Sequence, residues 1–483
     1  MNYLGIDIGT SSIKSIVIND KNQIVEEYEY PLIVKNKQNN YSEQDPEDWY
    51  KGVISCIKKI KSNVKSLSFS GQMHTLVPID KKGEVIRDAI LWNDGRSSKE
   101  CKEATDFLGG EEKVLSITGN PFLEGFTLPK LLWLKKNEFE NYEKIYKILL
   151  PKDYIIYKLT GNIGIDYSDA SGTGFLDIKN NKWSDKILNE LKISKEILPE
   201  IYESNEFRGQ MNHEHMKNVL VYSGGADNPI SAFGNGVLHK GDSIISLGTS
   251  GTVLAVSEKK EPDKNGEIHF FNHVMKNKRY YMGVMLSATN SLNWFLKNIG
   301  NDIKLNDIEK IIKKVKPGND KVIFLPYLNG ERTPLRDPTA KGVFFGIKNT
   351  TTKNDLLKSV IEGISYGIGQ SYKLVKKKTD IKEIRITGGG SKNKEWVKIL
   401  ASIIKEPIGI PKAENGGAFG AALMAKYSIN DVELSEIKDI TSIKEYIYPD
   451  ENYLKVYDIL FPEYIKVTKS LMSNFHSLNS LNF

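Results

Sequence analysis

Hydrophobic and polar positions follow two alternating patterns along the chain. Short apolar runs, typical of buried strands, are followed by longer segments in which apolar residues recur at helical spacing. The alternation continues over the whole length and predicts an α/β protein. The first two runs, residues 3–8 and 13–18, are joined by the turn Gly9-Thr10-Ser11-Ser12, so we expect a hairpin there.

An aspartate, Asp7, lies inside the first apolar run, where an unpaired carboxylate is costly. The turn after it offers several backbone N–H groups and hydroxyls to one small volume, which suits phosphate oxygens. A carboxylate beside a phosphate requires a hard dication between them, and Mg²⁺ is the usual one. Asp7, the turn and Lys14 therefore fit a Mg·ATP site, although the turn alone is equally typical of a plain hairpin.

The start of the chain resembles a segment near its middle. IDIGTSSIKSIVI and IISLGTSGTVLAV each read strand, Gly-Thr-Ser turn, strand. Thr10 and Thr249 take equivalent positions, and Ser246 stands where the first copy has Asp7. The match predicts two similarly built domains, each opening with a phosphate-sized hairpin loop.

The length of 483 residues is sufficient for two domains. Glycine becomes frequent near the middle of the chain, and a new strand is expected to begin at Asp242 or Ser243. We therefore predict an N-terminal domain over residues 1–240 and a C-terminal domain over residues 241–483.

The composition, 40% hydrophobic and 27% charged, is typical of a globular protein. No apolar stretch reaches the length of a membrane span. Two cysteines form neither a disulfide framework nor a metal-ligand spacing, which favours the reducing cytoplasm. The net charge of +6 comes from lysines scattered over amphipathic helices, so no nucleic-acid site is expected.

The expected ATP site belongs to neither of the two common glycine-rich classes. The chain lacks the GxxxxGK[ST] pattern and a strand-following GxGxxG pattern. In KEIRITGGGSKNKEW, however, a predicted strand runs into three glycines and then into a helix that begins near Asn393. Bare glycines allow the backbone to approach a flat ligand such as adenosine, and a plain strand-to-helix turn is the alternative.

A second aspartate of interest, Asp227, follows a predicted strand over residues 219–222. Pro229 suits the first helical position, which makes Asn228 the expected helix cap and frees Asp227 from that role. Asp227 is then a candidate general base that takes a proton from an attacking hydroxyl, with a turn role as the alternative.

Two other polar clusters follow predicted strands in the first half. Met73 and His74 come after the strand at residues 67–69, where α/β proteins bind ligands, and a structural histidine is an equal alternative. Trp92, Asp94 and Arg96 in AILWNDGR favour a buried Asp–Arg pair that holds a loop, with a sugar contact as the second interpretation.

Together the motifs resemble those of the FGGY carbohydrate kinases over nearly the whole chain. They include GIDIGTSSIK, GQMH, AILWNDGR, GFTLPKLLW, SDASGT, GGADN, SLGTSG, FLPYLNGERTP, KGVFFG and TGGGSKN. GFTLPKLLWLKKN and GVFFGIKNTTTKNDLLKSVIEG are similar to the two family signatures. GQMH and WNDGR are most similar to the bacterial xylulokinase pattern, since glycerol kinases carry an Arg-Glu pair where this chain has Met73 and His74.

The resemblance implies two actin-like (ribonuclease H-like) domains with mixed sheets, flanked by helices, and an active-site cleft between them. It implies ATP-dependent phosphorylation of D-xylulose to D-xylulose 5-phosphate. By position it implies these roles: Asp227 as the base; Met73, His74, Asp227 and Asn228 at the sugar; Asp7 at Mg²⁺ through water; Thr10, Ser11, Lys14 and Thr249 at the phosphates; Gly389, Gly390 and Asn393 at the adenosine.

Three alternatives to this function remain open from the sequence. Another FGGY kinase, for ribulose or a different ketose or polyol, is the nearest, because discrimination of one hydroxyl depends on contacts that motifs do not reveal. An actin-like ATPase without sugar kinase activity is the second. A sugar-sensing regulator is disfavoured, since Asp227 is present and no segment is spare for a DNA-binding helix pair. The sequence leaves the quaternary state open, and a homodimer is the candidate.

Overall fold

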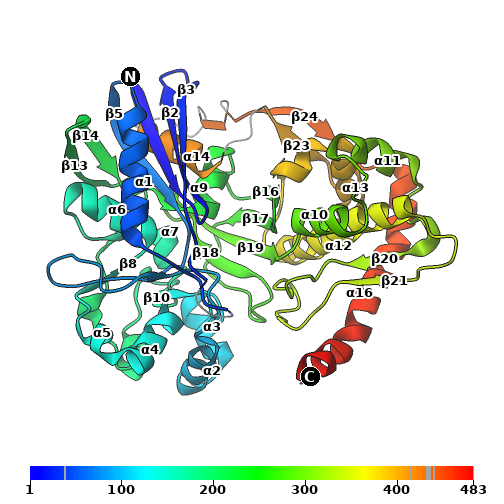
Figure 1. Ribbon diagram of the computed structural model, residues 1–483, viewed down its shortest axis with the longest axis horizontal. Helices are drawn as coiled ribbons and strands as arrows, with labels where there is room; N and C mark the ends of the chain where they lie inside the picture. The colour runs from blue at the N-terminus through cyan, green and yellow to red at the C-terminus, as the bar shows by residue number, and fades with distance from the viewer. Residues whose placement is uncertain (37–39, 413–415, 431–436, 439–440, 482–483) are drawn as a thin grey trace.

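Two α/β halves make up the molecule, each built on one large mixed sheet (Figure 1). The computed structural model describes residues 1–36, 40–412, 416–430, 437–438 and 441–481. The alternation of strands and helices predicted from the hydrophobic pattern is confirmed. Within these ranges, no helix combines the length and the apolar character that crossing a bilayer requires.

The first sheet has the strand order β13-β14-β5-β1-β2-β3. Its strands are β1 Asn2–Ile8, β2 Ser12–Asn19, β3 Ile24–Pro31, β5 Val64–Gly71, β13 Phe207–His213 and β14 Met216–Tyr222, with the short β15 Gly225–Ala226 beside the end of β5. The expected hairpin is formed by β1 and β2, which pair antiparallel around the Gly9–Ser12 turn, and β1 pairs parallel with β5 on its other side.

The second sheet has the order β18-β19-β17-β16-β22-β23-β24. Its strands are β16 Asp242–Leu247, β17 Gly251–Ser257, β18 His269–Asn272, β19 Arg279–Met285, β22 Glu383–Thr387, β23 Ile408–Pro411 and β24 Ile443–Ile447. As in the first sheet, a hairpin opens the unit and its first strand, β16, pairs parallel with a later strand. The internal repeat read from the Gly-Thr-Ser match therefore corresponds to two sheets of the same local topology.

Helices pack on both sheets. They are α1 Pro46–Lys59, α6 Pro151–Thr160, α9 Asp227–Gly234 and α14 Gly417–Asn430 at the first sheet, and α10 Thr289–Asn298, α11 Ile308–Lys314, α12 Lys353–Lys378, α13 Lys394–Ile404 and α16 Glu451–Ser480 in the second half. An inserted region of the first half contains α2 Ser98–Phe107, α3 Glu111–Thr118, α4 Thr127–Asn137, α5 Phe139–Glu143, α7 Tyr167–Ala170 and α8 Asp185–Glu190.

Short elements complete the fold. They are the strands β4 Glu43–Gln44, β6 Val77–Ile79, β7 Ala89–Ile90, β8 Lys147–Leu149, β9 Ile165–Asp166, β10 Leu176–Asp177, β11 Lys182–Trp183, β12 Ile201–Tyr202, β20 Ile323–Leu325 and β21 Val343–Phe345, and the 3₁₀ turns η1 Lys195–Ile197, η2 Leu305–Asp307, η3 Asn319–Lys321 and η4 Gly389–Lys392.

The two faces of β1 pack against different helices. Leu4, Ile6 and Ile8 belong to the apolar cluster that includes α1 and α6, whereas Tyr3 belongs to the cluster formed with α9 and α14. Because side chains alternate between the faces of a strand, Asp7 lies on the α14 face, in line with Tyr3. The acid in this strand therefore points away from the apolar α1 side.

Helix α14 comes from the second half of the sequence but packs on the first sheet. Figure 1 shows this helix, orange like its sequence neighbours, beside the blue strands of β1 and β2. A Cβ atom on Gly5 of β1 would lie 1.9 Å from the carbonyl oxygen of Ala418 and 2.3 Å from the backbone nitrogen of Ala422. A glycine at position 5 is thus required for the helix to lie directly on the strand.

We expect Gly5→Ala to lower the free energy of unfolding by about 3 kcal/mol or more, because the added methyl must displace the backbone of α14. Gly416→Ala is the matched control, since a Cβ there meets no atom within 4 Å. Urea unfolding of both variants checks this. Equal midpoints for the two variants would contradict the close contact between β1 and α14.

Candidate active site

A cavity of about 220 Å³ lies where elements of the two halves meet. Elements of both halves form its wall, which includes Asp7, Asp227, Asn228, Ser231, Ala232, Ile244, Ser246, Thr252, Leu254, Thr387 and Gly417. Asp7 and Ser246, the two residues at matching positions of the internal repeat, both belong to this wall. The repeated hairpins therefore contribute to one site rather than to two.

Asp7 is fixed by its neighbours on the adjacent strand and helix. The hydroxyl of Ser70 at the end of β5 donates a 2.6 Å hydrogen bond to Oδ1 of Asp7. Gly417 at the first turn of α14 is so close that a Cβ there would lie 2.3 Å from the Ser70 hydroxyl oxygen and 3.0 Å from Asp7 Oδ1. Burial raises the pKa of Asp7, while the bond from Ser70 opposes that shift.

Asp227 is the first residue of α9. The prediction that Asn228 caps this helix was therefore wrong. The residue before the helix is Ala226, and its backbone continues the short strand β15. The backbone N–H and the Nδ2 group of Asn228 donate to Oδ1 of Asp227 at 2.7 and 2.9 Å. No described residue donates a hydrogen bond to Oδ2 of Asp227. This oxygen is therefore free to contact a ligand in the cavity.

The two carboxylates influence each other. Burial and the negative charge of Asp7 together raise the pKa of Asp227 to about 7, against the two hydrogen bonds from Asn228. A carboxyl group with a pKa near neutrality is half ionised at physiological pH and suits a general base. Two acids that share one recess also form an oxygen-rich environment in which a divalent cation would relieve their repulsion.

His74 lies close by in a left-handed backbone conformation with φ of 66°. Its ring stacks on Phe126 with centroids 4.4 Å apart, and its Nδ1 atom lies 2.6 Å from the carbonyl oxygen of Gly172. Since a carbonyl only accepts, Nδ1 must carry the proton and Nε2 must be an acceptor. Burial lowers the pKa of His74 to about 3, so the ring is neutral and this tautomer persists.

The backbone of His74 is held by the signature segment GFTLPKLLW. Its carbonyl oxygen accepts hydrogen bonds from Thr127 Oγ1 at 2.9 Å and from the buried Lys130 Nζ at 3.3 Å. Met73 is buried next to it, with its sulfur 3.9 Å from Nδ2 of Asn228. Met73, His74, Asp227 and Asn228, the residues expected at the sugar, therefore lie in one neighbourhood.

The residues expected at the phosphates occupy the two hairpin turns. Thr10 accepts a 2.9 Å hydrogen bond from Trp92 Nε1, while Ser11 and Thr249 are exposed at their turns. Lys14 lies directly across from Asp7 on β2, but its ammonium group forms a 2.7 Å ion pair with Glu27. These turns border the cleft without forming the wall of the 220 Å³ cavity.

A separate cavity of about 600 Å³ contains the residues expected at the adenosine. Gly389, Gly390 and Asn393 line it together with residues of α10, η2, α11 and α13. A Cβ on Gly389 would meet no atom within 4 Å, so this backbone is open to a ligand. Asn393 caps α13 by accepting the Trp396 N–H at 3.0 Å, and no described residue accepts from its Nδ2 group.

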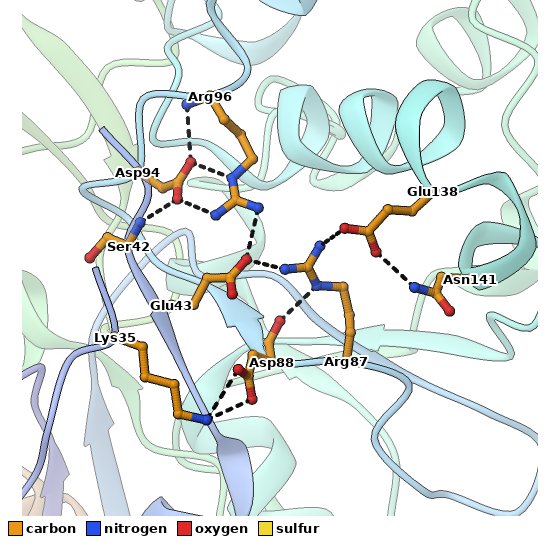
Figure 2. A network of polar contacts seen from close by, with 9 residues as sticks. All are labelled: Lys35, Ser42, Glu43, Arg87, Asp88, Asp94, Arg96, Glu138 and Asn141. Carbon is orange, nitrogen blue, oxygen red and sulfur yellow. Dashed lines mark hydrogen bonds and ion pairs between the residues drawn. The ribbon is translucent and has the colours of Figure 1, made fainter. Parts of the chain in front are cut away.

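The loop with Trp92, Asp94 and Arg96 has the structural role that the sequence favoured. Figure 2 shows Asp94 bonded to the Arg96 guanidinium and to the Ser42 N–H, with distances of 2.6–2.8 Å. Arg96 also contacts Glu43 at 2.8 Å, and Glu43 in turn binds Arg87. The network fixes the loop from which Trp92 reaches Thr10.

Sequence reasoning missed three residues that shape this site. Ser70 and Gly417 hold and border Asp7, and Gly172 presents its carbonyl to His74. A signal existed for two of them, since Gly172 stands in the motif SDASGT and Gly417 follows Gly416 in a glycine pair. Ser70 had no such signal, because serine is common at the ends of strands.

Comparison with known proteins agrees with this architecture. The FGGY family of carbohydrate kinases matches with its N-terminal domain at residues 2–234 and its C-terminal domain at residues 244–429. Xylulose kinase of Staphylococcus xylosus is 40% identical over 480 residues, covering 95% of this chain and 98% of the relative. Xylulose kinase of Bacillus subtilis is 36% identical over 495 residues, covering 99% and 98%.

The fold agrees as well. The crystal structure of ligand-bound xylulose kinase from Lactobacillus acidophilus matches with a TM-score of 0.94 at 25% identity, covering 99% of each chain. The prediction of two mixed-sheet domains with a cleft between them is thereby confirmed. Since both family domains match in order and together span most of the residues, this chain belongs to the FGGY family of carbohydrate kinases.

Proposed function

We propose that the chain transfers the γ-phosphoryl group of ATP to the O5 hydroxyl of D-xylulose, giving D-xylulose 5-phosphate and ADP. The family supports a sugar as acceptor and ATP as donor. The choice of xylulose is supported by the names of the relatives, which are xylulose kinases at 36–40% identity over nearly the full chain. The observation that carries the chemistry is Asp227, a recessed carboxylate whose pKa is raised to about 7.

Asp227 acts as the general base in this proposal. Its Oδ1 is occupied by the two donors of Asn228, so Oδ2 is the atom that accepts the proton of the sugar hydroxyl. The deprotonated hydroxyl oxygen attacks the γ-phosphorus, and ADP leaves. Phosphoryl transfer asks little covalent chemistry of a protein, so alignment and electrostatic stabilisation supply most of the rate.

The sugar is held by Met73, His74 and Asn228 together with the base. The acceptor Nε2 of His74 suits a hydroxyl donor on the substrate, because Nδ1 is committed to the Gly172 carbonyl. Gly389, Gly390 and Asn393 bind the adenosine, and Thr10, Ser11, Lys14 and Thr249 bind the phosphates. For that role Lys14 must exchange its ion pair with Glu27 for a phosphate oxygen.

Asp7 is proposed to hold Mg²⁺ through water. The fit rests on the donor set, since two carboxylates with hydroxyl neighbours provide the hard oxygen atoms that Mg²⁺ prefers. When bound, the ion supplies positive charge to the phosphate oxygens. Water would compete with the sugar as the nucleophile, so we propose that the two halves close only when sugar fills the cleft.

The proposal also covers the domain division, the cellular compartment and the binding partners. The domain division is 1–240 and 241–483, with α14 packed on the sheet of the other domain. We propose that the protein acts in the cytoplasm, binds no nucleic acid and forms a homodimer.

We expect D-xylulose to give the highest rate of ADP release in a panel with D-ribulose, L-ribulose, L-xylulose, D-fructose and glycerol, over a low rate without sugar. A coupled assay with saturating Mg·ATP measures this. If another sugar leads, the xylulose assignment is wrong although the kinase assignment stands. Equal rates with every sugar and with none would instead indicate an ATPase.

Asp227→Asn is expected to reduce kcat about 10²–10⁴-fold, because the variant lacks the proton acceptor. ATP affinity should remain unchanged. The same variant should be more heat-stable than the wild type above pH 7. The folded-state pKa of Asp227 exceeds its unfolded value, so ionising this carboxyl costs stability as pH rises, and the gain should vanish near pH 4.

Asp106→Asn, an exposed substitution at a side chain without an ion pair to any described residue, serves as the matched control for both measurements. Thermal unfolding between pH 4 and pH 9 and steady-state kinetics test the pair. A near-normal kcat in Asp227→Asn would remove the base from the proposal, and a stability difference that is independent of pH would contradict the burial of its charge.

Gly172→Ala is expected to raise the KM for the sugar about tenfold. A Cβ at this position would lie 2.8 Å from Nδ1 and Cε1 of the His74 ring, so the ring must turn away from its present orientation. The KM for ATP should stay at the wild-type value. A sugar KM that does not change would show that the orientation of His74 is irrelevant to binding.

A further inference from the structure

A hollow of about 640 Å³ lies apart from the catalytic cleft and is strongly basic. Its wall consists of Lys179, Asn180, Asn181, Glu258, Lys260, Lys276, Asn277, Lys278 and Arg279, a set named here the basic hollow. Five cationic side chains face one carboxylate. The proposed kinase chemistry uses none of these residues.

Arg279 provides the buried charge of the basic hollow. It is only 3% exposed, at the first residue of β19. Its Nη2 group donates a 2.8 Å hydrogen bond to the carbonyl oxygen of Ile178, but its Nε group is buried without a partner. Among the described residues, no carboxylate lies within ion-pair distance of this guanidinium.

Such a charge is unfavourable on its own. A buried cation normally has a paired anion, because desolvation otherwise costs several kcal/mol. Burial accordingly lowers the pKa of Arg279, and Tyr281 opposes that shift. Within the part of the chain that the structure describes, this guanidinium therefore has no counter-ion.

The lysines around Arg279 increase the positive charge rather than neutralise it. Lys278 pairs with Glu258, the one acid of the wall, and the exposed Lys276 approaches Glu203 at 3.7 Å. Lys179 and Lys260 form no ion pair with any described residue. The basic hollow therefore has more cations than acids around a buried guanidinium. Such a surplus suits an anion with several charges.

Both halves of the chain contribute to the basic hollow. Lys179 and its neighbours lie in the turn between β10 and β11 of the first half, whereas the other cations come from β19 and from the segments beside it. The bond from Arg279 to Ile178 and a 3.1 Å bond from Asn272 to Asn181 join the two segments. A ligand here would thus contact both halves, as an interdomain ligand site does.

We propose that the basic hollow binds a small molecule carrying at least two phosphate groups. Its volume exceeds what one phosphate fills, and the surplus positive charge exceeds what one phosphate neutralises. Arg279 supplies the directional donors at the floor, and Lys179, Lys260 and Lys276 supply mobile charges at the rim. This site is separate from the proposed nucleotide site on η4 and α13.

Inorganic pyrophosphate in metal-free buffer is the probe, followed by calorimetric titration and thermal unfolding. We expect Arg279→Met to bind pyrophosphate at least tenfold more weakly than the wild type. Without pyrophosphate this variant should unfold at the same or a higher temperature than the wild type, because an uncompensated buried charge has been replaced by an apolar side chain of similar length.

The double variant Lys260→Glu and Lys276→Glu tests the rim without altering a buried side chain. It should also lose at least tenfold in pyrophosphate affinity. Lys102→Glu with Lys310→Glu is the matched control, since both lysines are exposed on helices elsewhere and the change in net charge is the same. All variants should retain the wild-type affinity for ATP and the wild-type kcat.

Three results would overturn the proposal. The first is equal pyrophosphate affinity in the wild type and both hollow variants. The second is a large loss of heat stability in Arg279→Met without anion, which would make Arg279 a structural residue. The third is equal affinity for inorganic phosphate and pyrophosphate, which would rule out a ligand with two phosphate groups.

Discussion

Direct contact between α14 and β1 is the constraint on which the rest of the structure depends. A Cβ on Gly5 or on Gly420 would collide with backbone atoms. Helix α14 therefore approaches both β1 and α9 without side chains between the backbones. Because α14 belongs to the second half of the sequence, this contact holds that half against the first sheet. It also brings Gly417, the start of the helix, to the side of Asp7.

Burial keeps each polar group of the cleft in one chemical state. The Asp227 carboxyl has a pKa near neutrality because it is recessed beside another acid, whereas the His74 ring stays neutral because it is recessed beside Phe126. The hydrogen bonds then select atoms within those groups: Oδ2 of Asp227 and Nε2 of His74 are left for a ligand. Preorganisation of this kind avoids rearrangement of dipoles during the reaction.

The local features of the fold followed from the sequence. Apolar runs located β1, β2 and β16, and the Gly-Thr-Ser repeat indicated two sheets of one topology. The prediction that Asn228 caps α9 was wrong. Gly225 and Ala226 pair with β5, so the chain remains extended up to Asp227, where the helix begins. The sequence did not predict that α14 packs on the first sheet, or that Lys14 pairs with Glu27. Both contacts join different segments of the chain, and local sequence patterns do not reveal such contacts.

The position of α14 in the chain also affects synthesis on the ribosome. Tyr3, Ile16 and Ile18 of the first sheet are covered by α9 and α14, and α14 is completed only at Asn430. At about 5–20 residues per second, the strands of residues 1–222 wait roughly 10–40 s for this cover. During that interval an apolar face of the first sheet stays partly exposed on the nascent chain. We expect chaperones to bind this face until α14 has been synthesised.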